Sequence, residues 1–186
     1  KEPSQEKMDS VDDKWKDSMD DYNVMLVTIG RSSTENGTYL PGVDGVDASQ
    51  NLNQTDPLGL SDDERDLINA AVEAKENNGG KVIVMLNNAN AMEIDEIKNN
   101  DGVDAIMEIG FPGGYGFYGV ADILSGEANP SGHLTDTYAV TNANSPAAQN
   151  FGNYEWTNAD PSVNINAEEV EAEDIYTGYK YYETRY

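Results

Sequence analysis

The stretch SDDERDLINAAVEAKENNGGKVIVML, residues 61–86, contains one complete helix-to-strand unit. Ser61 followed by Glu64 is the capping-box pattern that opens a helix, and apolar residues then recur at helical spacing. The helix should end near Gly80, because paired glycines are typical of a helix C-terminus. The nearly continuous apolar run 81–86 predicts a strand buried on both faces, as in parallel sheets. The unit therefore indicates a fold in which helices alternate with strands.

Segments on either side follow the same alternation. Buried strands are expected at 23–30 and 104–110, an edge strand at 133–140, and short helices at 91–98 and 118–124. The tail 174–186 is rich in tyrosine and is expected to prefer an extended conformation. It forms either a packed aromatic strand or a platform on which sugar rings stack. Strands and helices in this order predict an α/β protein with a mostly parallel sheet.

The charge of the chain excludes several classes of partner. Among 186 residues there are 35 acids and 11 bases, which gives a net charge of −24. Nucleic acid is excluded because phosphate contacts need clustered lysine and arginine. The same charge argues against docking on an anionic membrane surface. No apolar run approaches the roughly 18 residues of a membrane span, so no membrane insertion is expected in this segment.

The residue inventory also limits the chemistry. There is no cysteine, which excludes disulfides, thiol catalysis and cysteine-ligated zinc. The single histidine, His133, cannot build a multi-histidine metal site and does not favour a Ser-His-Asp triad. Asp44, Asp47 and Asp56 lack calcium-loop spacing. We therefore predict no cofactor and no specific metal. The first residues lack an apolar signal core and an initiator methionine, which suggests a processed form or part of a longer chain and leaves the compartment undetermined.

A glycine motif after the third expected strand allows two interpretations. Gly114, Gly116 and Gly119 have the GxGxxG spacing of dinucleotide-binding loops, and Asp136 follows where a ribose-binding acid is expected. Against this, at least two strands precede the motif, whereas the fingerprint usually lies in the first βαβ unit. The other interpretation is a strand-to-helix turn in which glycine allows close backbone packing.

Longer motifs resemble glycoside hydrolase family 3, which contains β-glucosidases and β-xylosidases. The run PGGYGFYGVADILSGEANPSGHLTD at 112–136 is similar to the family pattern PGxEGGxAIADVLxGxxNPSGKLPxT. Residues 84–93 resemble VVxNSGNPxE, residues 60–70 resemble L-(S/T)-xxExxLIxAV, and residues 173–183 resemble EGIYVGYRYYE. The order and spacing of these motifs agree with the family over roughly residues 23–185.

The resemblance implies a fold and a domain organisation. Residues 23–186 are expected to form the family's C-terminal type of domain, an α/β three-layer sandwich. Its mostly parallel sheet would have about five to six strands, with helices on both faces. Residues 1–22 would be an acidic arm or linker. The family's catalytic (β/α)₈ barrel is absent, because a barrel needs about 250 residues. The chain alone is therefore expected to be inactive.

The resemblance also implies a reaction. Family members are retaining glycosidases that use two carboxyl groups. The stretch at 29–38 resembles the loop that carries the acid/base in many members, and this aligns Glu35 with that residue. Thr34 and Asn36 depart from the glycine-rich pattern around it. The expected partners are the protein's own barrel domain, which carries the nucleophilic aspartate, and a β-linked oligosaccharide or glycoside. A non-catalytic nucleotide-binding or interaction domain of Rossmann-like fold remains the alternative.

Overall fold

The protein was analysed as a computed structural model that describes residues 18–31, 58–150 and 172–185. Three strands form a parallel sheet in the order β1-β2-β3. These strands are β1 (Val24–Gly30), β2 (Lys81–Asn87) and β3 (Ala105–Glu108). The described part of the chain is thus an α/β domain with a parallel sheet, as predicted. Its sheet has three strands rather than five to six, so the expected sheet size was wrong for these residues.

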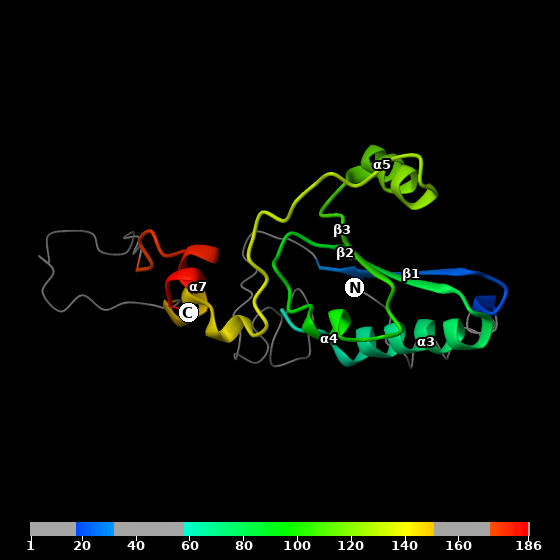
Figure 1. The fold of residues 1–186 in the computed structure, drawn as a ribbon, viewed down its shortest axis with the longest axis horizontal. Coiled ribbons are helices and arrows are strands. Elements are labelled where there is room, and N and C mark those ends of the chain that lie inside the picture. The colour runs from blue at the N-terminus through cyan, green and yellow to red at the C-terminus, as the bar shows by residue number, and fades with distance from the viewer. Residues whose placement is uncertain (1–17, 32–57, 151–171, 186) are drawn as a thin grey trace, which may run out of the picture.

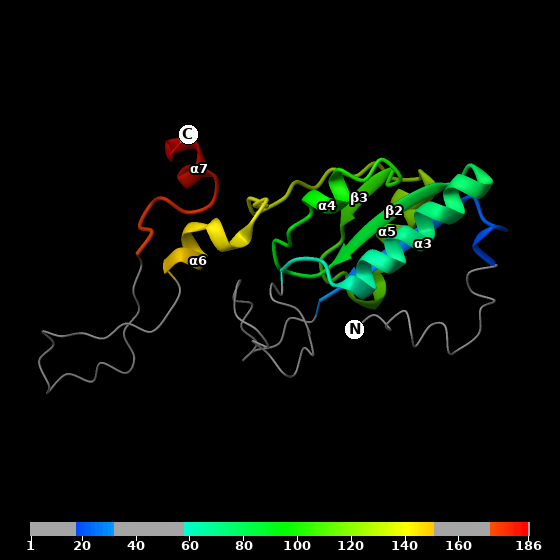
Figure 2. The same ribbon diagram turned by 90° about the horizontal axis from the view of Figure 1, so that it is seen from below.

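Helix α3 (Asp62–Asn78) connects β1 to β2 and forms the main cover of the sheet. Both predicted caps are confirmed. Ser61 Oγ accepts a hydrogen bond from the Glu64 amide at 3.2 Å, and Glu64 Oε2 accepts one from the Ser61 amide at 2.7 Å. Gly79 ends the helix at a φ of 73°, where glycine carries no steric penalty. Figure 2 shows α3 lying over the sheet, nearly along the direction of the strands.

One continuous core lies between the sheet and α3. It is built from alternate residues of β1 and of β2 and from the inner face of α3. Leu60, Met92 and Ile97, the last in α4 (Asp95–Lys98), complete it. The buried members are Met25, Val27, Ile29, Leu60, Ile68, Ala71, Ala74, Val82, Val84, Leu86, Met92 and Ile97. Burial of this apolar surface is the main force that holds α3 and α4 against the sheet.

The second face of the sheet is less covered than the sequence predicted. Val24, Leu26 and Thr28 of β1 are exposed, so this strand is buried on one face only. Helix α5 (Gly113–Ser125) lies on this side of the sheet, opposite α3 and α4, but it contains no buried residue (Figure 1). Only β2, the central strand, approaches the two-sided burial that its sequence predicted.

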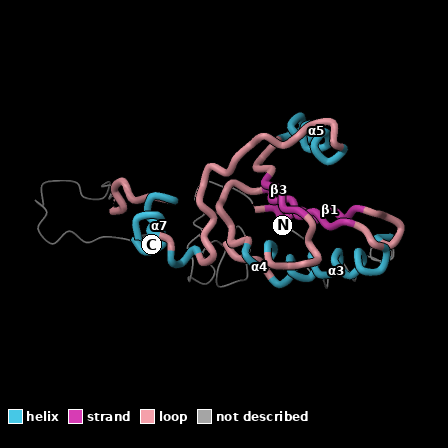
Figure 3. The backbone as a smooth tube through the Cα atoms, in the orientation of Figure 1, coloured by secondary structure: helices cyan, strands magenta, loops and turns pink. Residues whose placement is uncertain are grey.

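The C-terminal third differs most from expectation. Residues 133–140 form no strand and run as a loop from α5 towards a short 3-10 helix, η1 (Asn142–Asn144) (Figure 3). Helix α6 (Pro146–Asn150) follows. The tyrosine-rich tail forms helix α7 (Tyr179–Arg185) rather than a strand. The predictions of an edge strand and of a β tail were therefore wrong. Alternating apolar residues and aromatic residues pack well on a β-sheet, but this preference alone does not determine whether the backbone forms a strand.

A charge cluster at the amino ends of β2 and β3 ties α3 to the sheet. The Asp104 carboxylate accepts hydrogen bonds from Lys75 Nζ at 2.7 Å and from Lys81 Nζ at 2.8 Å. It also accepts one from the Val82 amide at 2.9 Å. These three hydrogen bonds hold the pKa of Asp104 well below its usual range. The bond from Lys75 has the largest effect, and those from Lys81 and Val82 come next.

We expect Asp104→Asn to lower the melting temperature at neutral pH, because both lysines lose their ionic partner. A carboxyl group whose pKa is lower in the folded than in the unfolded state stabilises the fold above the unfolded pKa of about 3.9. That contribution disappears as the pH falls through the folded pKa. The difference in melting temperature between wild type and variant should therefore shrink below about pH 4. Asp101→Asn is the matched control, because Asp101 is exposed and forms no ion pair among the residues described.

Candidate functional site

The carboxyl edge of the sheet gathers polar groups from all three strands. In parallel α/β sheets, ligands bind outside the carboxyl ends of the strands. Here Gly30 pairs with Asn87, and Leu86 pairs with Glu108, so the three strands end at neighbouring positions. The side chains that follow these ends therefore come together although they are far apart in sequence.

Arg31, the first residue after β1, is buried at this edge. Its amide donates to the Asn87 carbonyl at 3.2 Å, which continues the β1–β2 ladder by one residue. Its guanidinium forms a fork on Glu64, with Nη1 donating to Oε1 and Nη2 donating to Oε2 at 2.7 Å. Nη2 also donates to the Gly59 carbonyl at 3.0 Å. We call Arg31, Gly59 and Glu64 the arginine clasp. It joins the end of β1 to the start of α3.

The ends of β2 and β3 are joined by a second set of hydrogen bonds. Asn87 Nδ2 donates to the Gly110 carbonyl, and Glu108 Oε1 accepts from the Gly110 amide at 2.7 Å. The Tyr138 hydroxyl donates to Glu108 Oε2 at 3.1 Å. Burial raises the pKa of Tyr138 above its usual range, and the neighbouring Glu108 carboxylate raises it further. Tyr138 therefore remains a protonated donor throughout the neutral range, and both oxygens of Glu108 are engaged.

The turn after β2 is fixed by asparagine side chains. Asn88 is buried and accepts a hydrogen bond from the Asn90 amide at 3.0 Å through Oδ1. Asn142, also buried, donates from its amide to Glu93 Oε1 and from Nδ2 to the Ala91 carbonyl at 3.2 Å. This turn therefore holds η1, which lies more than 45 residues later in the chain, against the sheet.

Glu35, the predicted acid/base, lies outside the described residues. The structure describes the chain up to Arg31, four positions earlier. The clasp and the Glu108–Tyr138 pair were not predicted from the sequence. From the sequence, Glu64 was interpreted only as a capping residue of the helix. The capping-box pattern does not show that its side chain is buried.

The glycine motif does not lie at this edge as a phosphate loop. Gly114, Gly116 and Gly119 all fall inside α5, whereas the fingerprint places its first glycine in the tight turn before the helix. The close-packing interpretation holds at Gly116 only, where an added Cβ would lie 2.8 Å from Pro112 Cβ. A Cβ at Gly114 or Gly119 would meet no heavy atom within 4 Å. Tyr115 is 90% exposed, and Asp136 is exposed beside Thr135.

The described residues also restrict other kinds of site. They contain no group of three or more histidine, aspartate or glutamate side chains that could hold a metal ion. None of their helices is long and apolar enough to cross a membrane. His133 is exposed. Asp44, Asp47 and Asp56 fall outside these residues.

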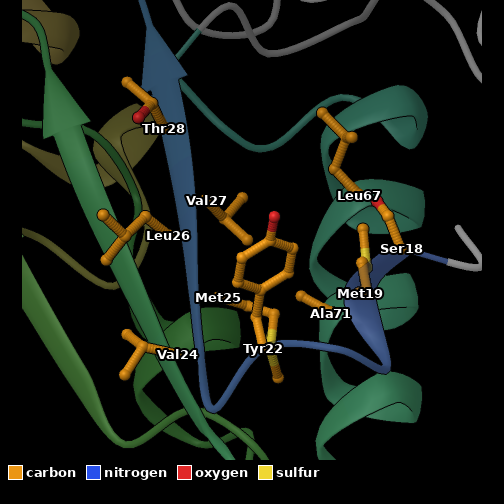
Figure 4. Close-up of a pocket in the computed structure, with 10 residues that line it drawn as sticks. All are labelled: Ser18, Met19, Tyr22, Val24, Met25, Leu26, Val27, Thr28, Leu67 and Ala71. Atoms are coloured by element: carbon orange, nitrogen blue, oxygen red, sulfur yellow. The ribbon is translucent and has the colours of Figure 1, made fainter. Parts of the chain in front are cut away.

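An apolar pocket of about 310 Å³ lies away from the carboxyl edge, between β1 and α3. Figure 4 shows the Tyr22 ring between the strand and the helix, with Met19 and Leu67 on the helix side. Its ten lining residues include no acid, no base and no amide side chain. Carboxylate chemistry therefore cannot be performed by the lining of this pocket.

The protein is therefore an α/β domain in which polar side chains gather at the carboxyl ends of parallel strands. A sequence model of the Glycosyl hydrolase family 3 C-terminal domain matches residues 5–181, and the chain belongs to this family. The predicted family is therefore confirmed.

Named relatives agree with this membership. The chain is 27% identical to thermostable beta-glucosidase B of Acetivibrio thermocellus over 170 residues, which are 91% of this chain and 20% of that protein. It is 36% identical to beta-xylosidase/alpha-L-arabinofuranosidase 1 of Medicago sativa over 59 residues, 32% of this chain and 8% of that protein. The structure of beta-glucosidase 3B from Thermotoga neapolitana in complex with glucose matches with a TM-score of 0.66 at 30% identity. That match covers 91% of this chain and 21% of the other. The chain thus spans about a fifth, or less, of the length of these relatives.

Proposed function

We propose that this chain is the second domain of a retaining β-glycosidase that hydrolyses O-glycosidic bonds of β-glucosides or related β-glycosides. Glu35 is the general acid/base of this reaction. The nucleophile is an aspartate of a barrel domain that is not part of these 186 residues. The proposal is supported by the membership of the chain in a glycoside hydrolase family and by relatives named as β-glucosidases and a β-xylosidase.

The observation that carries the assignment of Glu35 is the position of Arg31. Arg31 is held at the carboxyl end of β1, the edge where parallel sheets place their ligands. Glu35 follows four residues later in the sequence. Glu108, the described carboxylate nearest to the strand ends, already accepts hydrogen bonds at both oxygens. Because both of its oxygens are engaged, Glu108 is the weaker candidate for proton transfer to a substrate.

The mechanism divides the chemistry between two domains. The aspartate attacks the anomeric carbon and forms a glycosyl-enzyme, while Glu35 gives its proton to the departing glycosidic oxygen. In the second step Glu35 takes a proton from water, which attacks the anomeric carbon and releases the sugar and the aspartate. The two carboxyl groups must then stand about 5 to 5.5 Å apart. The proposed division of this chain, with 1–22 as an arm and 23–186 as the domain, leaves room for no barrel.

The isolated chain should therefore show no β-glucosidase activity, whereas the full-length protein should be active. Release of p-nitrophenol from p-nitrophenyl β-glucoside and β-xyloside measures both. The expected result is turnover by the full-length protein on at least one substrate and none above the buffer rate by the isolated chain. Hydrolysis by the isolated chain would contradict the division of the two carboxyl groups between domains. An inactive full-length protein on a panel of β-glycosides would contradict the proposed reaction itself.

A further inference from the structure

The side chain of Asn78, the last residue of α3, forms three hydrogen bonds. Its Nδ2 donates to the Tyr22 carbonyl at 2.8 Å and to the Met19 carbonyl at 3.2 Å. Its Oδ1 accepts from the Gly80 amide at 2.9 Å. Met19 and Tyr22 belong to residues 18–22, which precede β1 and which we call the entry turn. Asn78 therefore ties the entry turn to the end of a helix that lies more than 50 positions later in the chain.

The entry turn forms one wall of the apolar pocket between β1 and α3. Ser18, Met19 and Tyr22 all line this pocket (Figure 4). Within the turn, the amides of Asp21 and Tyr22 donate to the carbonyls of Ser18 and Met19 at 3.2 and 3.1 Å. These bonds stabilise the turn itself, whereas the bonds from Asn78 attach it to the helix. Loss of the Asn78 bonds would therefore loosen this wall of the pocket.

Asn78 is followed by glycine, the neighbour that least hinders deamidation because it has no Cβ. In this reaction the Gly79 backbone nitrogen attacks the side-chain carbonyl carbon of Asn78 and closes a cyclic imide. The bond from that carbon to Nδ2 breaks, and Nδ2 leaves as ammonia with the proton from the Gly79 amide. Water then opens the imide to aspartate or isoaspartate. The reaction consumes water, releases ammonia and needs no oxidant or reductant.

The folded end of α3 holds both reacting groups. The Gly79 amide donates to the Lys75 carbonyl at 2.7 Å, so its nitrogen is engaged in the last bond of the helix. The Asn78 side chain is fixed by its own three bonds. Attack on Asn78 therefore requires the last turn of the helix to open. Helix ends fray more readily than helix interiors, so this opening does not require the whole domain to unfold.

Neither product can hold the entry turn as asparagine does. An aspartate lacks the Nδ2 donor and faces two carbonyl oxygens with a negative charge. That charge also lies at the C-terminus of α3, where the helix dipole is already negative. An isoaspartate lengthens the backbone next to Gly79, whose φ of 73° ends the helix. Both products therefore favour the open state of the last turn.

We propose that Asn78 is a deamidation site controlled by the last turn of α3, and that its deamidation releases the entry turn and loosens the wall of the apolar pocket. The fold delays the reaction, and the reaction weakens the part of the fold that delayed it. The site lies at the amino ends of β1 and β2, where Val24 pairs with Lys81. It is thus separate from the carboxyl edge and does not depend on the proposed function.

The first test measures the reaction in the unmodified 186-residue chain. The chain is incubated in mildly alkaline buffer with and without urea, and peptide mass spectrometry follows aspartate and isoaspartate at position 78. We expect deamidation to be at least about 10-fold slower in the folded chain, which corresponds to an opening free energy of about 1.4 kcal/mol. Equal rates would show that the helix end does not control the reaction. An unfolded chain without either product would show that Asn78 is not a deamidation site.

Two glycine variants locate the opening. Glu76→Gly and Asp66→Gly each remove an exposed acid from α3, the first in its last turn and the second near its start. Glycine weakens a helix by about 1 kcal/mol, so Glu76→Gly should speed deamidation of the folded chain about 5-fold. Asp66→Gly should leave the rate within about 2-fold of wild type. Equal acceleration by both variants would assign the reaction to global unfolding and overturn control by the last turn.

Hydrogen exchange tests the release of the entry turn. Asn78→Asp reproduces the aspartate product, and amide exchange in residues 18–25 should rise at least about 10-fold because two hydrogen bonds to the turn are lost. Asn77→Asp is the matched control, since it adds the same charge at an exposed neighbour that forms none of these bonds. Its exchange should stay within about 2-fold of wild type.

The same measurement on the deamidated fraction of the wild-type chain, separated by ion exchange, serves if Asn78→Asp does not fold. An equal rise in both aspartate variants would assign the effect to charge at the helix end rather than to the lost bonds. Unchanged exchange in the deamidated chain would overturn the release of the entry turn.

Discussion

Replacement of Glu35 by alanine in the full-length protein should lower kcat/KM on alkyl β-glucosides by about 10²- to 10⁴-fold, the usual contribution of a positioned general acid. The reason is the leaving group. An alkoxide cannot depart without a proton, and Glu35 is the residue proposed to supply it. On 2,4-dinitrophenyl β-glucoside the first step should be nearly unaffected, because dinitrophenolate is a stable anion.

The second step provides an independent signature of the same variant. Without its base, the glycosyl-enzyme reacts slowly with water and accumulates, so a burst of dinitrophenolate should precede a slow steady state. Azide, an anionic nucleophile that needs no base, should raise the steady-state rate and yield a glycosyl azide. Stopped-flow absorbance and product analysis measure these effects.

Two further variants show whether the effect belongs to Glu35. Glu76→Ala, at an exposed position of α3, is the control for loss of one more negative charge from a strongly acidic chain. It should leave all rates near those of wild type. Glu108→Gln tests the other carboxylate at the strand ends. Unchanged kinetics of Glu35→Ala on alkyl glucosides, together with a selective loss in Glu108→Gln, would move the acid/base to β3.

The elements predicted well from the sequence are those determined by local chemistry. Helix α3 has a capping box at Ser61 and a left-handed glycine at Gly79, and both signals act within a few residues. Strand β2 is apolar throughout because it lies in the middle of the sheet, with a neighbour on each side. Such signals do not depend on what the rest of the chain does.

The elements predicted wrongly depend on tertiary context. Residues 133–140 alternate as an edge strand does, yet Tyr138 turns its hydroxyl to Glu108 and the segment forms a loop. The tail places Tyr181 and Tyr182 edge to face within one turn of α7, an arrangement that its aromatic content did not distinguish from a strand. Aromatic residues favour any surface on which they can pack, so their presence alone does not select the backbone.

The candidate site was predictable only in part. Glu35 is proposed through the family resemblance, since nothing in the local pattern separates it from the other acids of the chain. Arg31 and Glu64 each lie within a family-like motif, but their pairing joins positions 33 residues apart. A buried charge requires a partner, and only the fold shows which partner it has.

The second large effect expected is on stability, and it comes from leaving Glu64 without Arg31. Arg31→Met should destabilise the chain by about 3–5 kcal/mol, because the Glu64 carboxylate would remain buried with its ionic partner removed. Such a loss is a large fraction of the 5–15 kcal/mol typical of a folded domain. Urea unfolding followed by circular dichroism measures it as a lower midpoint.

The double variant Arg31→Met with Glu64→Met should recover much of this loss, because no charge is then left buried alone. It should stay about 1–3 kcal/mol less stable than wild type, because the Ser61 amide and the Gly59 carbonyl lose their side-chain partners. Arg65→Met, which breaks the exposed pair with Glu96, should cost no more than about 1 kcal/mol. A cost for Arg31→Met as small as that of Arg65→Met would mean that Glu64 reaches water, contrary to its burial. A double variant more stable than Arg31→Met would show that most of the loss comes from the unpaired charge and not from the missing hydrogen bonds.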